Sequence, residues 1–210
     1  MGKLDNGAYG HVNGKIGNLV SYTLNGENVI RKIGRSTKPP TNAQRAVQQK
    51  IKRVNQFLNP ILGYIKVGFS FAVERTGRYP HNMAVSCNVK NAMTGEYPNI
   101  EIDYSKALVS MGKLPTAINP NVQRLDNGVE FTWDVTDDMD WNIKNDRAML
   151  LLFFPGASDA IYFLSGAKRS EGRDFVELPA AYLSTQMQCY IAFYADNKQS
   201  LSNSIWAGSL

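Results

Sequence analysis

The chain of 210 residues is poor in the side chains that metal and catalytic sites use most. It has two cysteines, Cys87 and Cys189, which lie far apart in the sequence, and two histidines, His11 and His81. Neither histidine has a cysteine, histidine or acidic partner at ligand spacing, so a zinc site is not expected. Two distant cysteines are typical of reduced, partly buried thiols. We therefore expect no metal and no cofactor.

Long apolar runs are also missing. The best apolar stretch, Ala148 to Phe154, is far shorter than the roughly 18 residues that span a bilayer and is typical of a buried strand. The first residues, MGKLDNGAYGHVNG, lack the apolar core of a signal peptide, so Sec-type export is not expected. These features predict a protein without a membrane span, located in the cytoplasm or in a virion-like particle.

Acidic residues are absent from Asn28 to Val73, a segment that holds nine basic residues. Because the whole chain has a net charge of +5, the remainder is net acidic. The basic segment 28–73 can bind nucleic acid, or it can dock onto the acidic part of a neighbouring copy, and the charge alone leaves both alternatives open. The residues predicted to contact a partner are Arg31, Arg35, Lys38, Arg45, Lys52, Arg53, Gly14 and Gly17.

The clearest local pattern is a β-hairpin centred on Asn25-Gly26. Large side chains alternate with other residues over 20–24 and over 29–33, which is the period-two pattern of strands. Asn-Gly suits the two positive-φ positions of a type I′ turn. Upstream, Gly14 and Gly17 mark sites where the backbone bends or passes close to another chain. The glycine-rich residues 1–13 are predicted to form an arm or an irregular edge strand.

An amphipathic helix is predicted over residues 42–59. Lys38-Pro39-Pro40 stiffens the chain before it, and Thr41 with Gln44 three residues later is a capping box. The residues predicted to form its buried stripe are Ala43, Val47, Ile51, Val54 and Leu58. Pro60 suits the first turn of a second helix, over residues 61–67.

The pattern changes near residue 118. A short helix over 83–93 and an alternating strand over 100–111 precede a stretch rich in glycine and proline at residues 112–120. We place a domain boundary there, between an N-terminal α+β module (1–118) and a β-sandwich domain (119–210). The strands predicted in the second domain are 129–135, 148–154, 160–168, 174–178, 186–194 and 204–208. Short strands at this spacing predict an antiparallel sandwich with Trp133 as a core residue.

No pattern points to catalysis. Residues 10–15, GHVNGK, resemble a phosphate loop only superficially, because three residues instead of four separate the glycines and Ile16 follows the lysine. His11 sits in the glycine-rich arm and His81 in a predicted loop, and no nucleophile elbow accompanies either. We expect no enzymatic activity.

Four aspartates crowd one predicted turn: Asp134, Asp137, Asp138 and Asp140. Carboxylates are ligands for calcium, but the turn lacks the spacing of a calcium-binding loop. A solvated acidic turn is the preferred interpretation. Calcium binding and contact with the basic helix of a neighbouring copy are the alternatives.

Several motifs together resemble a known family. They are GKIGNLVSY from residue 14, the Asn-Gly turn with Arg31, KPPTNAQ at the helix start, AMTGEYPNIEIDYSKALVSMGKL from residue 92, EFTW from residue 130 and Ser202-Asn203-Ser204. The chain is similar, over nearly its whole length, to an uncharacterised domain-of-unknown-function family common in Bacteroidota. That resemblance implies no catalytic residues.

The C-terminal third also resembles fibronectin type III and immunoglobulin-like sandwiches, with Trp133 near the early core position. The expected fold class is therefore α+β: an N-terminal β-hairpin plus amphipathic helices, followed by an antiparallel immunoglobulin-like β-sandwich. We expect a non-enzymatic structural or adaptor protein that forms homo-oligomers or docks partners, in a phage-like or cell-associated particle. The alternative is a nucleic-acid-binding protein that uses segment 28–73.

Overall fold

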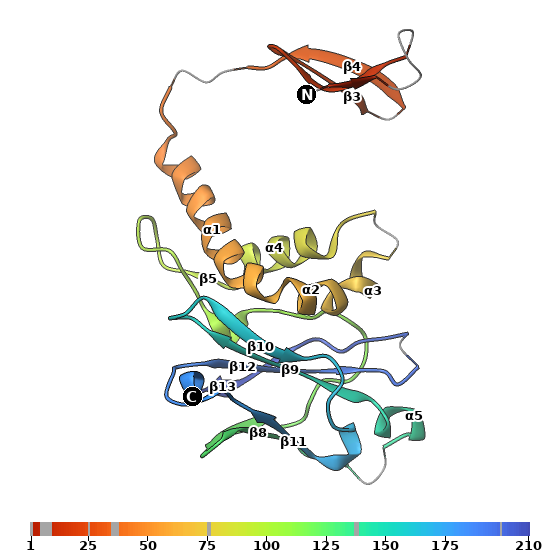
Figure 1. Ribbon diagram of the computed structural model, residues 1–210, viewed down its shortest axis with the longest axis vertical. Coiled ribbons are helices and arrows are strands. Elements are labelled where there is room, and N and C mark those ends of the chain that lie inside the picture. Colours follow the sequence, from red (N-terminus) through yellow and green to blue (C-terminus); the bar gives the residue numbers. More distant parts are fainter. Residues whose placement is uncertain are drawn as a thin grey trace. The chain divides into compact units, whose positions relative to one another are not determined.

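The computed structural model describes residues 2–4, 10–24, 26–34, 38–74, 77–136, 139–197 and 199–210. The chain divides into two compact units, Met1–Thr41 and Asn42–Leu210 (Figure 1). The fold is α+β: an antiparallel sheet forms the first unit, and helices packed on a β-sandwich form the second. The predicted boundary between residues 118 and 119 falls inside the second unit.

The N-terminal unit is a four-stranded antiparallel sheet in the order β1-β2-β3-β4. Its strands are β1 (Lys3–Leu4), β2 (Val12–Ile16), β3 (Leu19–Leu24) and β4 (Glu27–Lys32). The pairing of β3 with β4, in which Tyr22 lies opposite Val29, confirms the predicted hairpin. Gly26 has a φ of 86°, as the turn requires, while Asn25 lies outside the described residues.

Helices open the second unit. They are α1 (Asn42–Leu58), α2 (Leu62–Gly68), α3 (Ser70–Val73) and α4 (Pro80–Asn91), with a 3₁₀ turn over Asn59–Ile61. The first helix begins directly after Thr41, as the capping box predicts. Pro60 and Pro80 lie at helical first turns, where the missing N–H of proline costs no intrahelical hydrogen bond.

The predicted buried stripe of α1 is wrong in its first half. Val54 and Leu58 are fully buried, but Ala43, Val47 and Ile51 are exposed. Only the C-terminal turns of the helix pack into the core, where Phe57 is also buried. Helical periodicity identifies the residues that share a face, but it does not show how far along the helix a partner extends.

The predicted strand over residues 100–111 is also wrong. The residues that pair there form only a two-stranded ribbon, β5 (Met93–Thr94) with β6 (Glu101–Ile102). A 3₁₀ turn over Tyr104–Lys106 follows. Farther along, the backbone N–H of Val109 donates to Oγ of Ser204 at 2.9 Å. Side-chain acceptors of this kind satisfy the backbone without a neighbouring strand.

Two antiparallel sheets form the sandwich, in the orders β11-β8-β7 and β10-β9-β12-β13. Their strands are β7 (Asn121–Leu125), β8 (Gly128–Thr132), β9 (Arg147–Phe154), β10 (Asp159–Phe163), β11 (Arg173–Glu177), β12 (Gln188–Tyr194) and β13 (Ile205–Ser209). Each strand predicted for this region overlaps one of them. Trp133 is 5% exposed, which confirms it as a core residue.

Strand β9 is buried on both faces because its sheet lies between the helices and the second sheet (Figure 1). Met149, Leu151 and Phe153 pack in one core with the helices, whereas Leu150 and Leu152 pack in the other core with the three-stranded sheet. A strand covered on both sides needs apolar residues at every position. This arrangement accounts for the apolar run in the sequence.

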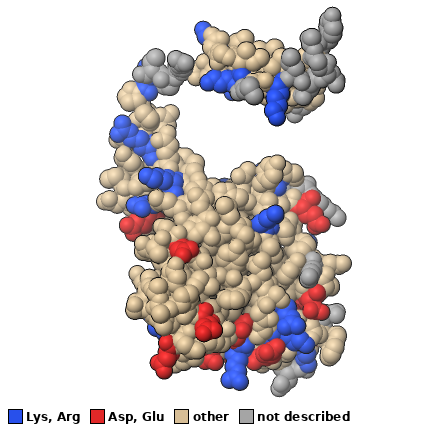
Figure 2. Space-filling model, in the orientation of Figure 1, with Lys and Arg blue, Asp and Glu red and all other residues tan. Residues whose placement is uncertain are grey.

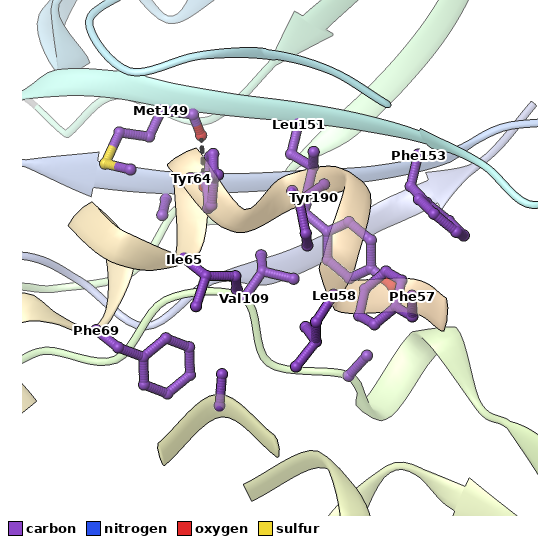
Figure 3. Packing of buried hydrophobic residues seen from close by; sticks show 14 of the residues in the cluster. Phe57, Leu58, Tyr64, Ile65, Phe69, Val109, Met149, Leu151, Phe153 and Tyr190 are labelled. Atoms are coloured by element: carbon purple, nitrogen blue, oxygen red, sulfur yellow. Dashed lines mark hydrogen bonds between the residues drawn. The ribbon is translucent and has the colours of Figure 1, made fainter. Parts of the chain in front are cut away.

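The core between helices and sheet joins residues from both sides of position 118 (Figure 3). The ring of Phe57 on α1 meets Phe153 edge-on, with 4.9 Å between centroids. The hydroxyl of Tyr64 on α2 donates to the backbone carbonyl of Met149 at 3.4 Å. The helices and the sandwich therefore share one hydrophobic core.

Candidate interaction surfaces

Three of the predicted partner-binding residues lie together on α1. Arg45, Lys52 and Arg53 are all exposed, and Arg45 and Lys52 are two helical turns apart, which places them on one side of the helix. Among the described residues, none of the three forms an ion pair with a carboxylate. Figure 2 shows basic side chains along this helix and charges of both signs over the sandwich.

The other predicted basic residues do not belong to that group. Arg31 lies on β4 in the N-terminal unit, with its guanidinium carbon 5.7 Å from the centroid of the Tyr22 ring. Lys38 is exposed in a segment without helix or strand just before α1, and Arg35 lies outside the described residues. The structure thus places the predicted basic residues in both units.

The two predicted glycines bend the backbone as expected. Gly14, within β2, has a φ of 107°, and Gly17, in the turn between β2 and β3, has a φ of 56°. Side chains with a Cβ rarely adopt positive φ. The bends are therefore a local requirement of the sheet, and close approach of another chain remains a prediction.

One face of the N-terminal sheet is basic. Lys15 and Arg31 lie opposite Val20 on either side of it, so the three side chains share this face. Lys15 and Arg31 are exposed while Val20 is partly buried. We call this the basic face and define it by Lys15, Val20, Tyr22, Leu24, Glu27, Val29 and Arg31. Its long cationic side chains can cover apolar neighbours and still reach water.

The opposite face is apolar over Val12, Gly14, Ile16, Leu19, Ser21 and Ile30, which we call the apolar face. Its border is polar, with Lys32 opposite Leu19 and Thr23 opposite Asn28. The exposed fraction is 54% for Ile16, 42% for Leu19 and 64% for Ile30. Among the described side chains of the unit, only Ser21 is buried. A sheet of three or more strands normally needs a covered hydrophobic face to be stable. Within the described residues, this sheet has no hydrophobic core of its own.

A groove of about 460 Å³ runs between α1 and α4. Its apolar lining comes from Ile51, Val85 and Val89. Two buried polar atoms in the groove residues, Oδ1 of Asn55 and Nε2 of His81, have no hydrogen-bond partner among the residues that the structure describes. The prediction that His81 lies in a loop is wrong, because Pro80 begins α4 and His81 is in its first turn.

A buried ion pair, absent from the sequence-based expectations, closes one end of the sandwich. Nη2 of Arg169 lies 3.2 Å from Oδ2 of Asp146, and the two side chains are 5% and 3% exposed. The guanidinium also donates to the carbonyls of Thr116 and Pro115, at 3.3 and 2.8 Å. Burial raises the pKa of Asp146 and lowers that of Arg169, and each partner's charge opposes the shift of the other.

The acidic turn is described only in part. Asp134 accepts a hydrogen bond from Nδ2 of Asn119 at 2.7 Å, and Asp140 comes just before the short helix α5 (Trp141–Lys144). Asp137 and Asp138 lie outside the described residues. In the part of the chain that the structure describes, no group of three or more histidine, cysteine or acidic residues could hold a metal ion.

Both cysteines are free thiols, Cys189 buried and Cys87 half-buried. Burial raises the pKa of Cys189 to about 12, against the opposing effect of Arg124. Burial also raises the pKa of Cys87, and the charge of Lys90 partly offsets this. Neither thiol is therefore activated as a nucleophile.

These features define an α+β protein in which helices cover a two-sheet sandwich and a separate sheet precedes them. The chain belongs to the family of unknown function DUF6266, whose model matches residues 11–208. No curated protein and no solved structure matches it. Within the described residues, the helices are too short or too polar to cross a membrane.

Proposed function

We propose that this protein is a non-enzymatic structural or adaptor protein that assembles through its N-terminal sheet. The observation that carries the proposal is the exposure of that sheet: Ile16, Leu19 and Ile30 are each more than two-fifths exposed. Native sheets cover such faces, and exposed apolar patches on stable proteins usually mark interaction sites. Burial of these side chains against another protein would supply the hydrophobic core that the described residues of the sheet do not form.

The second unit supplies a stable body for such an assembly. Its two cores are extensive and lie on both sides of β9. A structural role in a phage-like or cell-associated particle fits this division, in which a stable body carries a separate assembly sheet. The order of the seven sandwich strands, three in one sheet and four in the other, supports an immunoglobulin-like or fibronectin type III-like class for this body.

Sedimentation velocity of the full chain tests the proposal. We expect oligomers at protein concentrations from about 1 to 100 μM, and a shift toward monomer when residues 2–13 are deleted, because β1 and part of β2 are then lost. A full-length protein that stays monomeric at about 100 μM would contradict self-assembly. The near-ultraviolet circular dichroism of the deletion variant is the control for the second unit, whose cores contain no residue of the deleted segment.

A nucleic-acid-binding protein is the second candidate. Its support is the exposed basic side of α1, with Arg45, Lys52 and Arg53 and no acidic residue in the helix. Such side chains bind phosphates without sequence preference. Binding to single- and double-stranded probes at low salt distinguishes this candidate from a role in protein assembly alone.

A further inference from the structure

A pocket of about 370 Å³ lies in the second unit, beside one end of the core between helices and sheet. Three segments that are distant in the sequence form it: α1, the residues from β6 into the following 3₁₀ turn, and the turn between β9 and β10. Its volume is within the range of about 300 to 1,000 Å³ that is typical of small-molecule sites. We call it the α1–β6 pocket.

The floor of the α1–β6 pocket is aromatic and closely packed. Phe57 and Phe153 are 1% and 3% exposed and lie at the same end of the core (Figure 3). The ring of Tyr104 lies 5.7 Å from that of Phe57 and 5.8 Å from that of Phe153, measured between centroids. The hydroxyl of Tyr190 donates to the backbone carbonyl of Tyr104 at 2.8 Å. These contacts hold the half-buried Tyr104 against the core.

Five polar side chains line the pocket, and none of them forms a hydrogen bond or an ion pair with a described residue. They supply a guanidinium, an amide, a carboxylate and two hydroxyls, and therefore both donors and acceptors. A few polar groups that converge on one cavity are what fixes a ligand in a small-molecule site. The five residues are Arg53 and Gln56 on α1, Glu101 on β6, Tyr104 and Ser158.

Arg53 and Glu101 have opposite charges, yet they do not form an ion pair with each other. Both are exposed, and both act on the same phenol of the pocket. Burial raises the pKa of Tyr104, the charge of Arg53 lowers it, and the charge of Glu101 raises it. The pocket thus presents one cation and one anion that are near a common side chain but separate from each other.

We propose that the α1–β6 pocket binds a small zwitterion of the amino acid or dipeptide class, with the carboxylate of the ligand on Arg53 and its ammonium on Glu101. A guanidinium binds a carboxylate through two parallel N–H···O bonds. The carboxylate of Glu101 accepts from the N–H donors of an ammonium. The half-buried Tyr104, Ile102 and Pro155 line the same pocket and offer apolar surface to the side chain of the ligand.

The pair of charges favours a zwitterion over other small ligands. A small anion in the pocket would meet the like charge of Glu101, and a small cation would meet that of Arg53. A neutral sugar would leave both charges without a partner. The pocket lies wholly within the second unit, so this inference does not rest on self-assembly through the N-terminal sheet.

Isothermal titration calorimetry of the full chain tests the proposal with L-leucine and L-leucyl-L-leucine as probes. At least one of them should bind with a Kd below about 1 mM. Arg53→Gln and Glu101→Gln should each weaken that binding about tenfold or more, because each leaves one charge of the ligand unpaired. The matched controls are Arg173→Gln and Glu177→Gln on strand β11 of the other sheet, which should change Kd by less than about twofold.

Blocked forms of the probe that binds test the assignment of each charge. Its C-terminal amide lacks the carboxylate and its N-acetyl form lacks the ammonium, so each should bind about tenfold more weakly than the parent. Arg53→Gln should weaken the parent but not the amide, and Glu101→Gln should weaken the parent but not the N-acetyl form, because the contact is already missing. Absence of binding by both probes, or equal weakening of parent and blocked forms, would overturn the proposal.

Discussion

Nε1 of Trp133 donates a hydrogen bond to the backbone carbonyl of Arg169 at 2.7 Å. Both side chains then contact the same ring: Trp133 meets Phe193 edge-on, with 5.5 Å between centroids, and the guanidinium carbon of Arg169 lies 3.7 Å from the Phe193 centroid. A cation held over a ring in a dry interior is strongly attracted to it. One end of the sandwich core is thus closed by an aromatic pair and a buried cation.

Trp133→Ala should lower the free energy of unfolding by about 3 to 5 kcal/mol, because a large buried side chain leaves a cavity that relaxes only partly. The carbonyl of Arg169 would also lose its donor. Equilibrium denaturation with urea measures the change. Trp133→Phe keeps the ring contact but not the hydrogen bond and should cost less. A loss below about 1 kcal/mol for the alanine variant would contradict this account.

The ion pair between Arg169 and Asp146 predicts non-additive substitutions. Arg169→Met leaves the carboxylate of Asp146 buried without its cation and should cost about 3 to 5 kcal/mol. The double variant Arg169→Met with Asp146→Leu buries no charge, so it should be more stable than the arginine variant alone. Chemical denaturation of the wild type, both single variants and the double variant completes the cycle. Simple additivity of the two single losses would show that the pair is not coupled.

The two thiols should differ in their reactivity toward an alkylating reagent. Because the pKa of Cys189 is raised to about 12, it stays protonated at pH 8, whereas Cys87 is half-exposed. Iodoacetamide at pH 8 should therefore label Cys87 first and Cys189 only after unfolding, as mass spectrometry of peptides would show. Labelling of Cys189 in the native protein at the rate of Cys87 would contradict its burial.

The same shift has a consequence for stability. The folded-state pKa of Cys189 lies above the ordinary value of 9.0, so the unfolded chain loses this proton first as pH rises. The contribution of the protonated thiol is complete below pH 9 and is lost as pH rises toward 12. Cys189→Ala should make the free energy of unfolding less dependent on pH in that window.

If Lys52 and Arg53 contact phosphates, affinity for nucleic acid should fall steeply with salt. The variant with both residues changed to alanine should flatten the plot of log affinity against log salt by about one or two units. Fluorescence anisotropy with single- and double-stranded probes measures the slope. The control is Lys144→Ala, on the separate short helix α5, which should leave the slope unchanged. Absence of binding at about 50 mM salt would remove this candidate function.

The sequence by itself determined the local elements of this protein. The hairpin around Gly26, the start of α1 after Thr41 and the strand phase that buries Trp133 all follow from turn chemistry, capping and side-chain alternation. Each of these signals acts over a few residues and depends little on distant parts of the chain. The basic side of α1 could also be predicted from the sequence, because the spacing of Arg45 and Lys52 places them on one side of a helix.

Only the tertiary structure decided which of these surfaces are covered. Val47 and Ile51 have the periodicity of core residues, but no described residue of the second unit buries them. Arg169 has no sequence signal for burial, yet it is enclosed by Asp146 and Phe193, which come from distant strands and loops. The exposure of the apolar face around Ile30 could not be predicted from the sequence either, because the strand has an ordinary alternating pattern. Burial depends on which distant segments pack against a helix or strand in the folded protein. Periodicity identifies the residues that share a face, but it does not show whether another segment covers that face.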